Sequence, residues 1–152
     1  MTAEDLLLGK KKAGESVVVA GGGLVGCETA LFLAQRGKKV TIVEILGMVL
    51  RGINHNNRDY LLKLLVDAGV QILTEMNILE ISDEGVTVAD KSGAKTIIRA
   101  ETVVLAVGLT PRKNSWGSLR DKITEVYAIG DAVEARNVKN AIWEGYRTAR
   151  LI

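Results

Sequence analysis

The stretch that decides the fold is Val17-Val18-Val19-Ala20-Gly21-Gly22-Gly23-Leu24-Val25-Gly26, which leads into Cys27-Glu28-Thr29-Ala30-Leu31-Phe32-Leu33. An apolar, β-branched strand runs directly into the spacing Gly-x-Gly-x-x-Gly, and a helix follows. A second apolar strand, Val40-Thr41-Ile42-Val43, ends in the acid Glu44. The order of strand, glycine turn, helix, strand and acid is that of a βαβ unit that binds a dinucleotide.

Each glycine of the motif has its own physical reason. Gly21 lets the chain turn sharply out of the strand, Gly23 lets a pyrophosphate approach the backbone, and Gly26 lets the helix pack close to the sheet. The helix N-terminus offers unpaired N–H groups and the positive end of a dipole, which suit a phosphate. We therefore expect the nucleotide contacts to be Gly21, Gly22, Gly23, Leu24, Val25 and Gly26.

Glu44 lies 18 positions beyond Gly26, close to the usual place of the acid that binds a ribose. A carboxylate there repels a 2′-phosphate, so the sequence favours NAD over NADP. Arg51 follows closely and could reach a 2′-phosphate by folding back, which leaves the opposite preference open. The alternative interpretation of Glu44 is a solvated carboxylate at the end of a strand.

Composition excludes several classes of function. The chain has 152 residues, 47% hydrophobic and 25% charged, which predicts one domain over 1–152 with an ordinary globular core. A net charge of +2 does not argue for a nucleic-acid partner, and no apolar stretch approaches the ~20 residues of a membrane span. One cysteine and one histidine cannot build a disulfide, a zinc site or an iron–sulfur site. We expect a cytoplasmic protein, with no signal peptide.

The middle of the chain first continues the alternation of helix and parallel strand, and then changes to a series of short antiparallel strands. Asn54 or Asn56 can cap a helix over 59–66, and Gly69 suits its left-handed end. A third parallel strand at 70–73 then gives neighbouring strands in the order 3-2-1. Short strands separated by turn signals predict an antiparallel meander over 77–82, 85–89 and 95–99. Residues 1–15 read as a polar lead-in with one apolar turn.

The last third contains two further predicted strands and a helix. A buried strand covers 102–108 and ends in Gly108, a further candidate for a cofactor contact. A polar connection over 111–122 contains Trp116, which we interpret as a packing residue. A strand over 125–129 ends in Gly130-Asp131, and the final helix repeats apolar residues at helical spacing, so one of its faces should be buried. The fold class is therefore α/β, a Rossmann-like three-layer domain with a parallel sheet and an antiparallel three-stranded meander.

Three motifs together resemble the two-dinucleotide-domain flavoprotein fold of the pyridine nucleotide–disulfide oxidoreductases. They are Gly-Gly-Gly-Leu-Val-Gly-Cys-Glu-Thr-Ala from Gly21, Val-Leu-Ala-Val-Gly-Leu-Thr-Pro-Arg from Val104, and Val-Tyr-Ala-Ile-Gly-Asp-Ala-Val-Glu from Val126. With Asn140-Ala141-Ile142-Trp143-Glu144-Gly145-Tyr146-Arg147, they resemble more narrowly the C-terminal part of NADH:flavin oxidoreductases related to 2,4-dienoyl-CoA reductase, enoate reductase and trimethylamine dehydrogenase. The resemblance covers about Leu6 to Ile152.

The resemblance implies a larger parent protein. In that family a barrel with FMN and an iron–sulfur cluster precedes a split FAD-type domain, into which an NAD(P)-type domain is inserted. Residues 16–109 then correspond to the NAD-binding core, and residues 125–152 to the returning tail of the FAD-type domain. The barrel, the cluster cysteines and the first FAD glycine motif are missing from this sequence, so we expect a fragment whose partner is the rest of the flavoprotein. Faces that meet that partner could instead pair two copies as a homodimer.

The resemblance also implies roles for two acids. Asp131 would face the ribityl–pyrophosphate region of a flavin, and Glu28 would lie near the nicotinamide. The residues alone support a second interpretation of Glu28 equally well: an exposed acid on the first helical turn, favoured there by the helix dipole. We interpret Cys27 as a small packing residue and His55 as a surface residue. Without the FAD glycine motif, strand 125–129 could instead join the domain's own sheet beside 102–107 and place Asp131 above the nucleotide crevice.

The sequence therefore predicts the NAD(H)-binding module of a flavin-dependent NADH oxidoreductase, in which hydride passes from a nicotinamide to a flavin in the intact parent. No catalytic acid or base is identified, and the isolated chain should not turn over. Two alternatives stay open. One is a non-catalytic module that binds ADP or another adenine nucleotide, and the other is a small FAD-binding domain.

Overall fold

The computed structural model describes residues 1–111, 119 and 122–152, so Trp116 and most of the predicted connection 111–122 lie outside the described residues. The chain divides into two compact units, Met1–Val107 and Gly108–Ile152. Whether both belong to a single nucleotide-binding domain stays a prediction, as do the boundaries 16–109 and 125–152. Within the described residues, no helix has the length and apolar character needed to cross a membrane.

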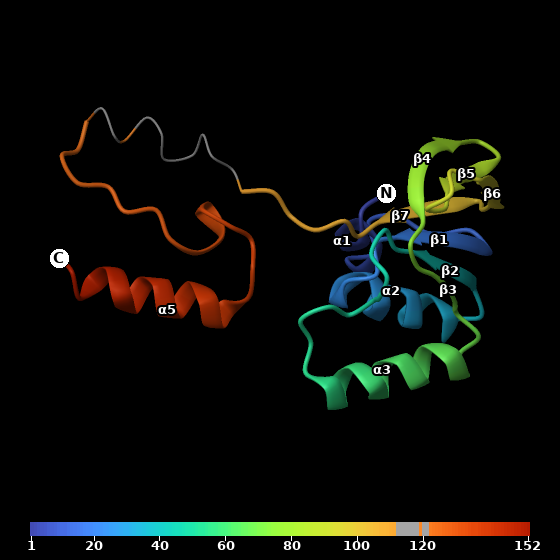
Figure 1. Ribbon diagram of the computed structural model, residues 1–152, viewed down its shortest axis with the longest axis horizontal. Coiled ribbons are helices and arrows are strands. Elements are labelled where there is room, and N and C mark those ends of the chain that lie inside the picture. Colours follow the sequence, from blue (N-terminus) through green and yellow to red (C-terminus); the bar gives the residue numbers. More distant parts are fainter. Residues whose placement is uncertain (112–118, 120–121) are drawn as a thin grey trace. The chain divides into compact units, whose positions relative to one another are not determined.

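A four-stranded parallel sheet forms the centre of the first unit (Figure 1). Its strands are β1 (Ser16–Ala20), β2 (Lys39–Val43), β3 (Gln71–Leu73) and β7 (Thr102–Leu105). They lie in the order β3-β2-β1-β7, and every pair is parallel. The predicted order of the first three strands is confirmed, and the strand predicted at 102–108 pairs with β1 over a shorter range.

Two helices connect the first three strands. α2 (Leu24–Ala34) follows the glycine turn. α3 (His55–Asp67) is capped by Asn54, whose side chain accepts a hydrogen bond from Asn56 N–H at 3.1 Å. The predicted cap at Asn54 is confirmed, and the helix runs through the predicted residues 59–66. Gly69 has a φ of +73°, the left-handed conformation expected after a helix.

The antiparallel meander is confirmed with the predicted bounds: β4 (Asn77–Ser82), β5 (Gly85–Ala89) and β6 (Lys95–Arg99) form a separate three-stranded sheet. Gly85 is the residue that the first turn requires, since its φ is +134° and a Cβ there would collide with the Ile98 carbonyl oxygen on β6. The meander therefore depends on a glycine at the start of its central strand.

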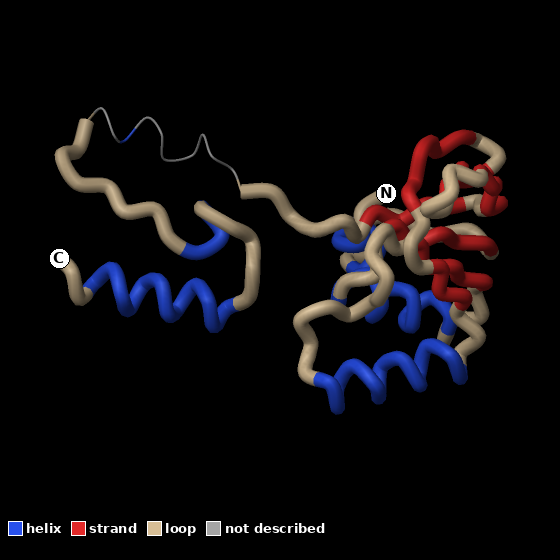
Figure 2. The backbone as a smooth tube through the Cα atoms, in the orientation of Figure 1, coloured by secondary structure: helices blue, strands red, loops and turns tan. Residues whose placement is uncertain are grey.

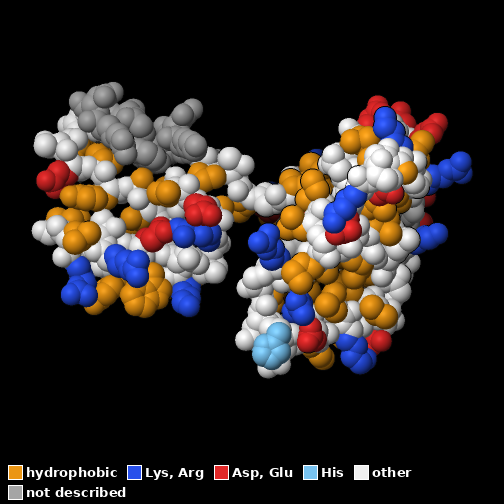
Figure 3. Space-filling view, in the orientation of Figure 1, with side chains coloured by type: hydrophobic (Ala, Val, Ile, Leu, Met, Phe, Trp, Pro, Cys, Tyr) orange, Lys and Arg blue, Asp and Glu red, His pale blue; other side chains and the backbone are white. Residues whose placement is uncertain are grey.

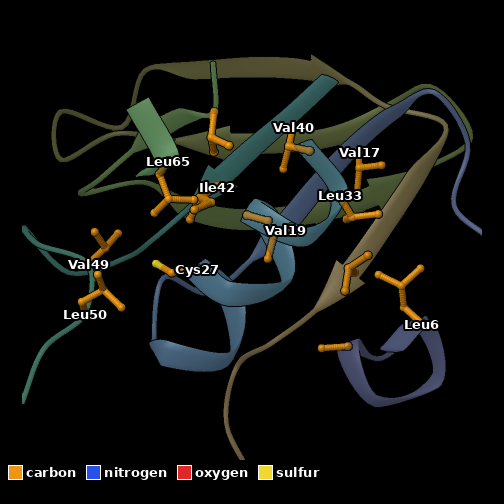
Figure 4. Packing of buried hydrophobic residues seen from close by; sticks show 14 residues of the cluster. Leu6, Val17, Val19, Cys27, Leu33, Val40, Ile42, Val49, Leu50 and Leu65 are labelled. Atoms are coloured by element: carbon orange, nitrogen blue, oxygen red, sulfur yellow. The ribbon is translucent and has the colours of Figure 1, made fainter. Parts of the chain in front are cut away.

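Side chains alternate between two faces of the parallel sheet and make three layers. Val17, Val19 and Ile42 face α2 and α3, and they form one hydrophobic cluster with residues of these helices (Figure 4). Val18 and Val43 face the other way and form a second cluster with strand β5 of the meander. Figure 2 shows the helices and the meander on opposite sides of the sheet in this unit. The predicted Rossmann-like three-layer α/β fold is confirmed.

The N-terminal segment is more ordered than the polar lead-in that the sequence predicts. It contains a short helix, α1 (Ala3–Leu7), which begins at Thr2 and buries Leu6 in the first cluster. Thr2 forms a parallel bridge with Leu105 on β7, and Leu105 N–H donates to the Met1 carbonyl at 2.8 Å. These first residues therefore occupy the edge of β7.

The prediction of a strand over 125–129 is wrong. This segment has no regular structure and belongs to the second unit, where it leads into a 3₁₀ turn, η1 (Gly130–Ala132). A strand needs a partner for its N–H and C=O groups, and the edge of β7 where this segment was placed already pairs with Thr2. The idea that Asp131 lies above the nucleotide crevice through this strand is therefore wrong as well.

The final helix, α5 (Val138–Ala149), is present, but it does not bury an apolar face within the described chain. Val138, Ile142 and Tyr146, which recur at helical spacing, are all more than half exposed. Figure 3 shows apolar and basic side chains together on the surface of this unit. The periodicity predicted the helix correctly, but α5 packs mainly against the small turn η1, which is too short to cover the stripe.

Candidate functional site

The glycine turn lies at the carboxyl end of β1, between that strand and α2. Gly23 is the N-cap of α2, and Gly23, Leu24 and Val25 are exposed, whereas Gly22 and Gly26 are buried. The first N–H groups of a helix have no partner within the helix. The turn thus presents an exposed helix N-terminus at the edge of the sheet where ligands of open α/β folds bind.

The glycines of the turn differ in whether the fold leaves room for a side chain. Gly21 has a φ of +106°, and a Cβ there would lie 2.5 Å from the Ala106 carbonyl oxygen. A Cβ on Gly26 would collide with the Gly21 carbonyl oxygen, so this glycine permits a close approach between the helix and the turn itself. A Cβ on Gly23 would meet nothing within 4 Å. The fold therefore requires Gly21 and Gly26, whereas Gly23 is free for a ligand.

Glu44 is buried at the end of β2, with 9% of its surface exposed. Gly22 N–H donates to its Oε2 at 2.6 Å, and Leu46 N–H donates to its Oε1 at 2.8 Å. The alternative of a solvated carboxylate is therefore wrong. Each carboxylate oxygen has a second lone pair that a ribose hydroxyl could use.

Gly22 is held through its carbonyl group as well. Leu50 N–H donates to the Gly22 oxygen at 2.7 Å, and Cys27 Sγ lies 3.4 Å from the same oxygen. Val49 packs so closely on Gly22 that a Cβ there would collide with the valine side chain. Sequence reasoning identified Glu44 but missed Val49 and Leu50, because neither belongs to a motif.

Cys27 is fully buried in the first cluster. Burial is the main cause that raises the pKa of its thiol to about 11, and the charges of Glu44 and Glu28 add to the increase. The helix N-terminus therefore does not produce a reactive thiolate here. The interpretation of Cys27 as a packing residue is confirmed.

The other candidate residues of the nucleotide site are exposed. Glu28 lies on the first turn of α2, and its exposure agrees with both interpretations offered for it. Arg51 and His55 are exposed after the Glu44 loop, which confirms the surface position of the histidine. Gly108, with a φ of +93°, begins the second compact unit. Its role in cofactor binding stays a prediction.

In the second unit, a small hydrogen-bonded network surrounds Asp131. Gly130 N–H donates to Glu144 Oε2 at 2.6 Å, and the guanidinium of Arg136 pairs with Glu144 Oε1. The backbone N–H of Arg136 donates to Asp131 Oδ1 at 3.3 Å. The hydrogen bond from Gly130 is the main cause that lowers the pKa of Glu144, and Arg136 lowers it further. Asp131 is exposed beside this network.

Comparison with known proteins places the fold and the motifs in one family. Residues 1–145 match the pyridine nucleotide-disulphide oxidoreductase family. The chain is 39% identical to a cinnamate reductase of Clostridium sporogenes over 154 aligned positions, and 39% identical to an NADH oxidase of Thermoanaerobacter brockii over 150. These alignments cover 99% and 97% of this chain but 23% of each relative.

A solved structure agrees with the sequence matches. The complex of 2-naphthoyl-CoA reductase with 2-naphthoyl-CoA superposes with a TM-score of 0.86 and 31% identity, over 100% of this chain and 23% of that protein. The chain thus spans about a quarter of the length of the relatives it matches. The resemblance drawn from its three motifs is confirmed, and the chain belongs to the pyridine nucleotide-disulphide oxidoreductase family.

Proposed function

We propose that this chain is the NAD(H)-binding module of a flavin-dependent NADH oxidoreductase. The observation that carries the proposal is the glycine turn with the buried Glu44 carboxylate hydrogen-bonded to Gly22 N–H. A pyrophosphate fits the exposed helix N-terminus at Gly23, and the ribose hydroxyls fit the remaining lone pairs of Glu44.

The same carboxylate supports a preference for NADH over NADPH. It is fixed by two backbone N–H groups, so it cannot swing away from a 2′-phosphate without leaving the buried Gly22 N–H and the partly buried Leu46 N–H unpaired. A phosphate dianion beside a carboxylate is repelled. Arg51 on the same loop is exposed, so solvent screens its attraction for a 2′-phosphate.

The nicotinamide would supply hydride and a flavin would accept it in the intact parent. The glycine turn and Glu44 would bind and orient the nucleotide, without a role in proton transfer. The FAD, the FMN and the iron–sulfur cluster that the family resemblance implies would be held by the rest of the parent. Asp131 would contribute to the flavin site and Glu28 to the nicotinamide side, and Gly108 would be a further cofactor contact. A cytoplasmic location, and a homodimer through the faces that would otherwise meet the rest of the parent, belong to the same proposal.

The test is calorimetric titration of the chain with NADH and ADP, together with the variant Gly23→Ala. A Cβ at Gly23 meets nothing in the free chain, so the variant should keep the unfolding free energy of the wild type. The methyl group would occupy the space of the pyrophosphate, so both ligands should bind at least tenfold more weakly. Unchanged binding by Gly23→Ala would contradict the proposal.

The same titrations separate the alternatives. Equal affinity for ADP and NADH would mean that the nicotinamide contributes nothing, which favours a non-catalytic module for adenine nucleotides. Bound flavin in the purified chain, seen as visible absorbance, would favour a small FAD-binding domain instead.

A further inference from the structure

Leu50 has a backbone conformation that leucine rarely adopts. Its φ is +56°, and the side chain is 1% exposed. Bulky residues with such a φ are strained and persist where their surroundings fix the conformation. Among the described non-glycine residues, Glu75 alone shares a positive φ. The conformation of Leu50 therefore needs a structural cause.

The cause lies in two contacts. The side chain of Leu50 is anchored in the same hydrophobic cluster as Cys27 and Leu65, and Figure 4 shows Leu50 and Val49 beside Cys27. The backbone N–H of Leu50 donates to the Gly22 carbonyl oxygen at 2.7 Å. The anchored side chain and the hydrogen bond together bring the loop after β2 against the glycine turn.

This hydrogen bond fixes the direction of the next N–H group. The Gly22 carbonyl and the Gly23 N–H belong to one planar, trans peptide, in which the two groups point in opposite directions. Because the carbonyl points to Leu50 and Cys27 in the protein interior, the Gly23 N–H points away from them. Gly23 is exposed, so its N–H points to the side from which a ligand can approach.

We propose that Leu50 is a positioning residue that aims the Gly23 N–H at the pyrophosphate before a nucleotide binds. Leu50 itself does not touch the ligand. Glu44 fixes the peptide on the other side of Gly22, so the two residues hold the turn in its binding conformation from both sides. The proposal rests on the proposed function, since it names how that site is pre-organised.

The test compares Leu50→Ala with Leu65→Ala. Both remove a leucine from the same cluster, with 1% and 0% exposure, and both should lower the unfolding free energy. Only Leu50→Ala releases the loop from Gly22. We expect its affinity for ADP to fall about tenfold while Leu65→Ala stays within about twofold of the wild type. Equal ADP affinity of the two folded variants would overturn the proposal.

A readout without nucleotide separates this inference from the proposed function. In ligand-free NMR spectra, the amide signals of Gly22 and Gly23 should shift or broaden in Leu50→Ala and stay unchanged in Leu65→Ala. Unchanged Gly23 signals in Leu50→Ala would refute the positioning role. If those signals move but the wild type binds neither ADP nor NADH, the proposed function fails and the positioning of the turn stands.

Milder variants keep the comparison available if an alanine variant does not fold. Leu50→Met and Leu65→Met preserve side-chain volume. Leu50→Met should restore ADP affinity to within about threefold of the wild type, because the anchor is retained. A Leu50→Met variant that folds and binds as weakly as the alanine variant would contradict anchoring through the apolar side chain.

Discussion

Two glutamates in this chain hold a glycine in the same way, in very different surroundings. Gly22 N–H donates to Glu44, and Gly130 N–H donates to Glu144, each at 2.6 Å. Glu44 is 9% exposed and its second donor is a backbone N–H. The Glu144 side chain is 31% exposed and its second partner is the guanidinium of Arg136. The nucleotide turn is thus held by a buried carboxylate, whereas the Gly130 turn is held by a carboxylate whose ion pair is accessible to solvent.

The comparison predicts its largest effect for Glu44→Ala. The substitution leaves the buried N–H of Gly22 and the partly buried N–H of Leu46 without an acceptor. We expect the unfolding free energy, measured by urea denaturation, to fall by about 3 kcal/mol. Glu28→Ala removes an exposed glutamate from the neighbouring helix and should change it by less than about 0.5 kcal/mol. Similar losses in both variants would mean that Glu44 is not a structural clamp.

A smaller and more local effect is expected from Glu144→Gln. The amide keeps an oxygen for Gly130 but loses the charge that pairs with Arg136. We expect faster hydrogen exchange of the Gly130 amide, with the exchange of Gly22 unchanged. Glu134→Gln is the matched control, because the Glu134 side chain also pairs with Arg136 but makes no described hydrogen bond to Gly130. The hydrogen bond from the backbone N–H of Glu134 to the Gly130 oxygen is kept in this variant. Faster exchange of Gly130 in the control would assign the effect to Arg136 alone.

Low pH should weaken the hydrogen bond between Glu144 and Gly130. The folded-state pKa of Glu144 is lowered from its ordinary value of 4.5, so its contribution to stability is present above pH 4.5 and is lost as the pH falls through the folded-state pKa. The Gly130 amide chemical shift should follow this titration and should lose its pH dependence in Glu144→Gln. A titration that persists in the variant would contradict the assignment to Glu144.

The smallest effect at neutral pH concerns Cys27. Its thiol has a pKa of about 11 and no exposed surface, so a thiol reagent should modify it in unfolded but not in native protein. Because the folded pKa is raised from 9.0, stability should fall as the pH increases from 9 to 11. Cys27→Ala should remove this alkaline decrease. Rapid modification of the native chain at pH 7 would show that the thiol is accessible.

The regions also differ in how far the sequence predicts them. Alternating apolar residues and turn glycines such as Gly85 predicted the meander, because strand faces and positive φ angles are local properties. The segment 125–129 has the same apolar pattern but forms no strand, since pairing depends on a partner that local sequence does not reveal. Thr2 occupies the edge that this segment was expected to use.

In the candidate site, too, the sequence predicted the residues of local motifs but not those that depend on tertiary packing. The spacing of Gly21, Gly23 and Gly26 predicted which residues form the turn, and Glu44 followed from its distance along the chain. Leu50 could not be predicted, because leucine gives no signal for a positive φ and its hydrogen bond to Gly22 depends on tertiary packing. A sequence motif therefore does not reveal residues such as Leu50, which position the site without contacting the ligand.

The most direct test of the central claim is the ratio of dissociation constants for NADPH and NADH, measured by calorimetry on the wild-type chain. A nucleotide site built on the glycine turn and the fixed Glu44 carboxylate predicts that NADH binds at least tenfold more tightly than NADPH. Tighter binding of NADPH, or no binding of either nucleotide, would contradict it.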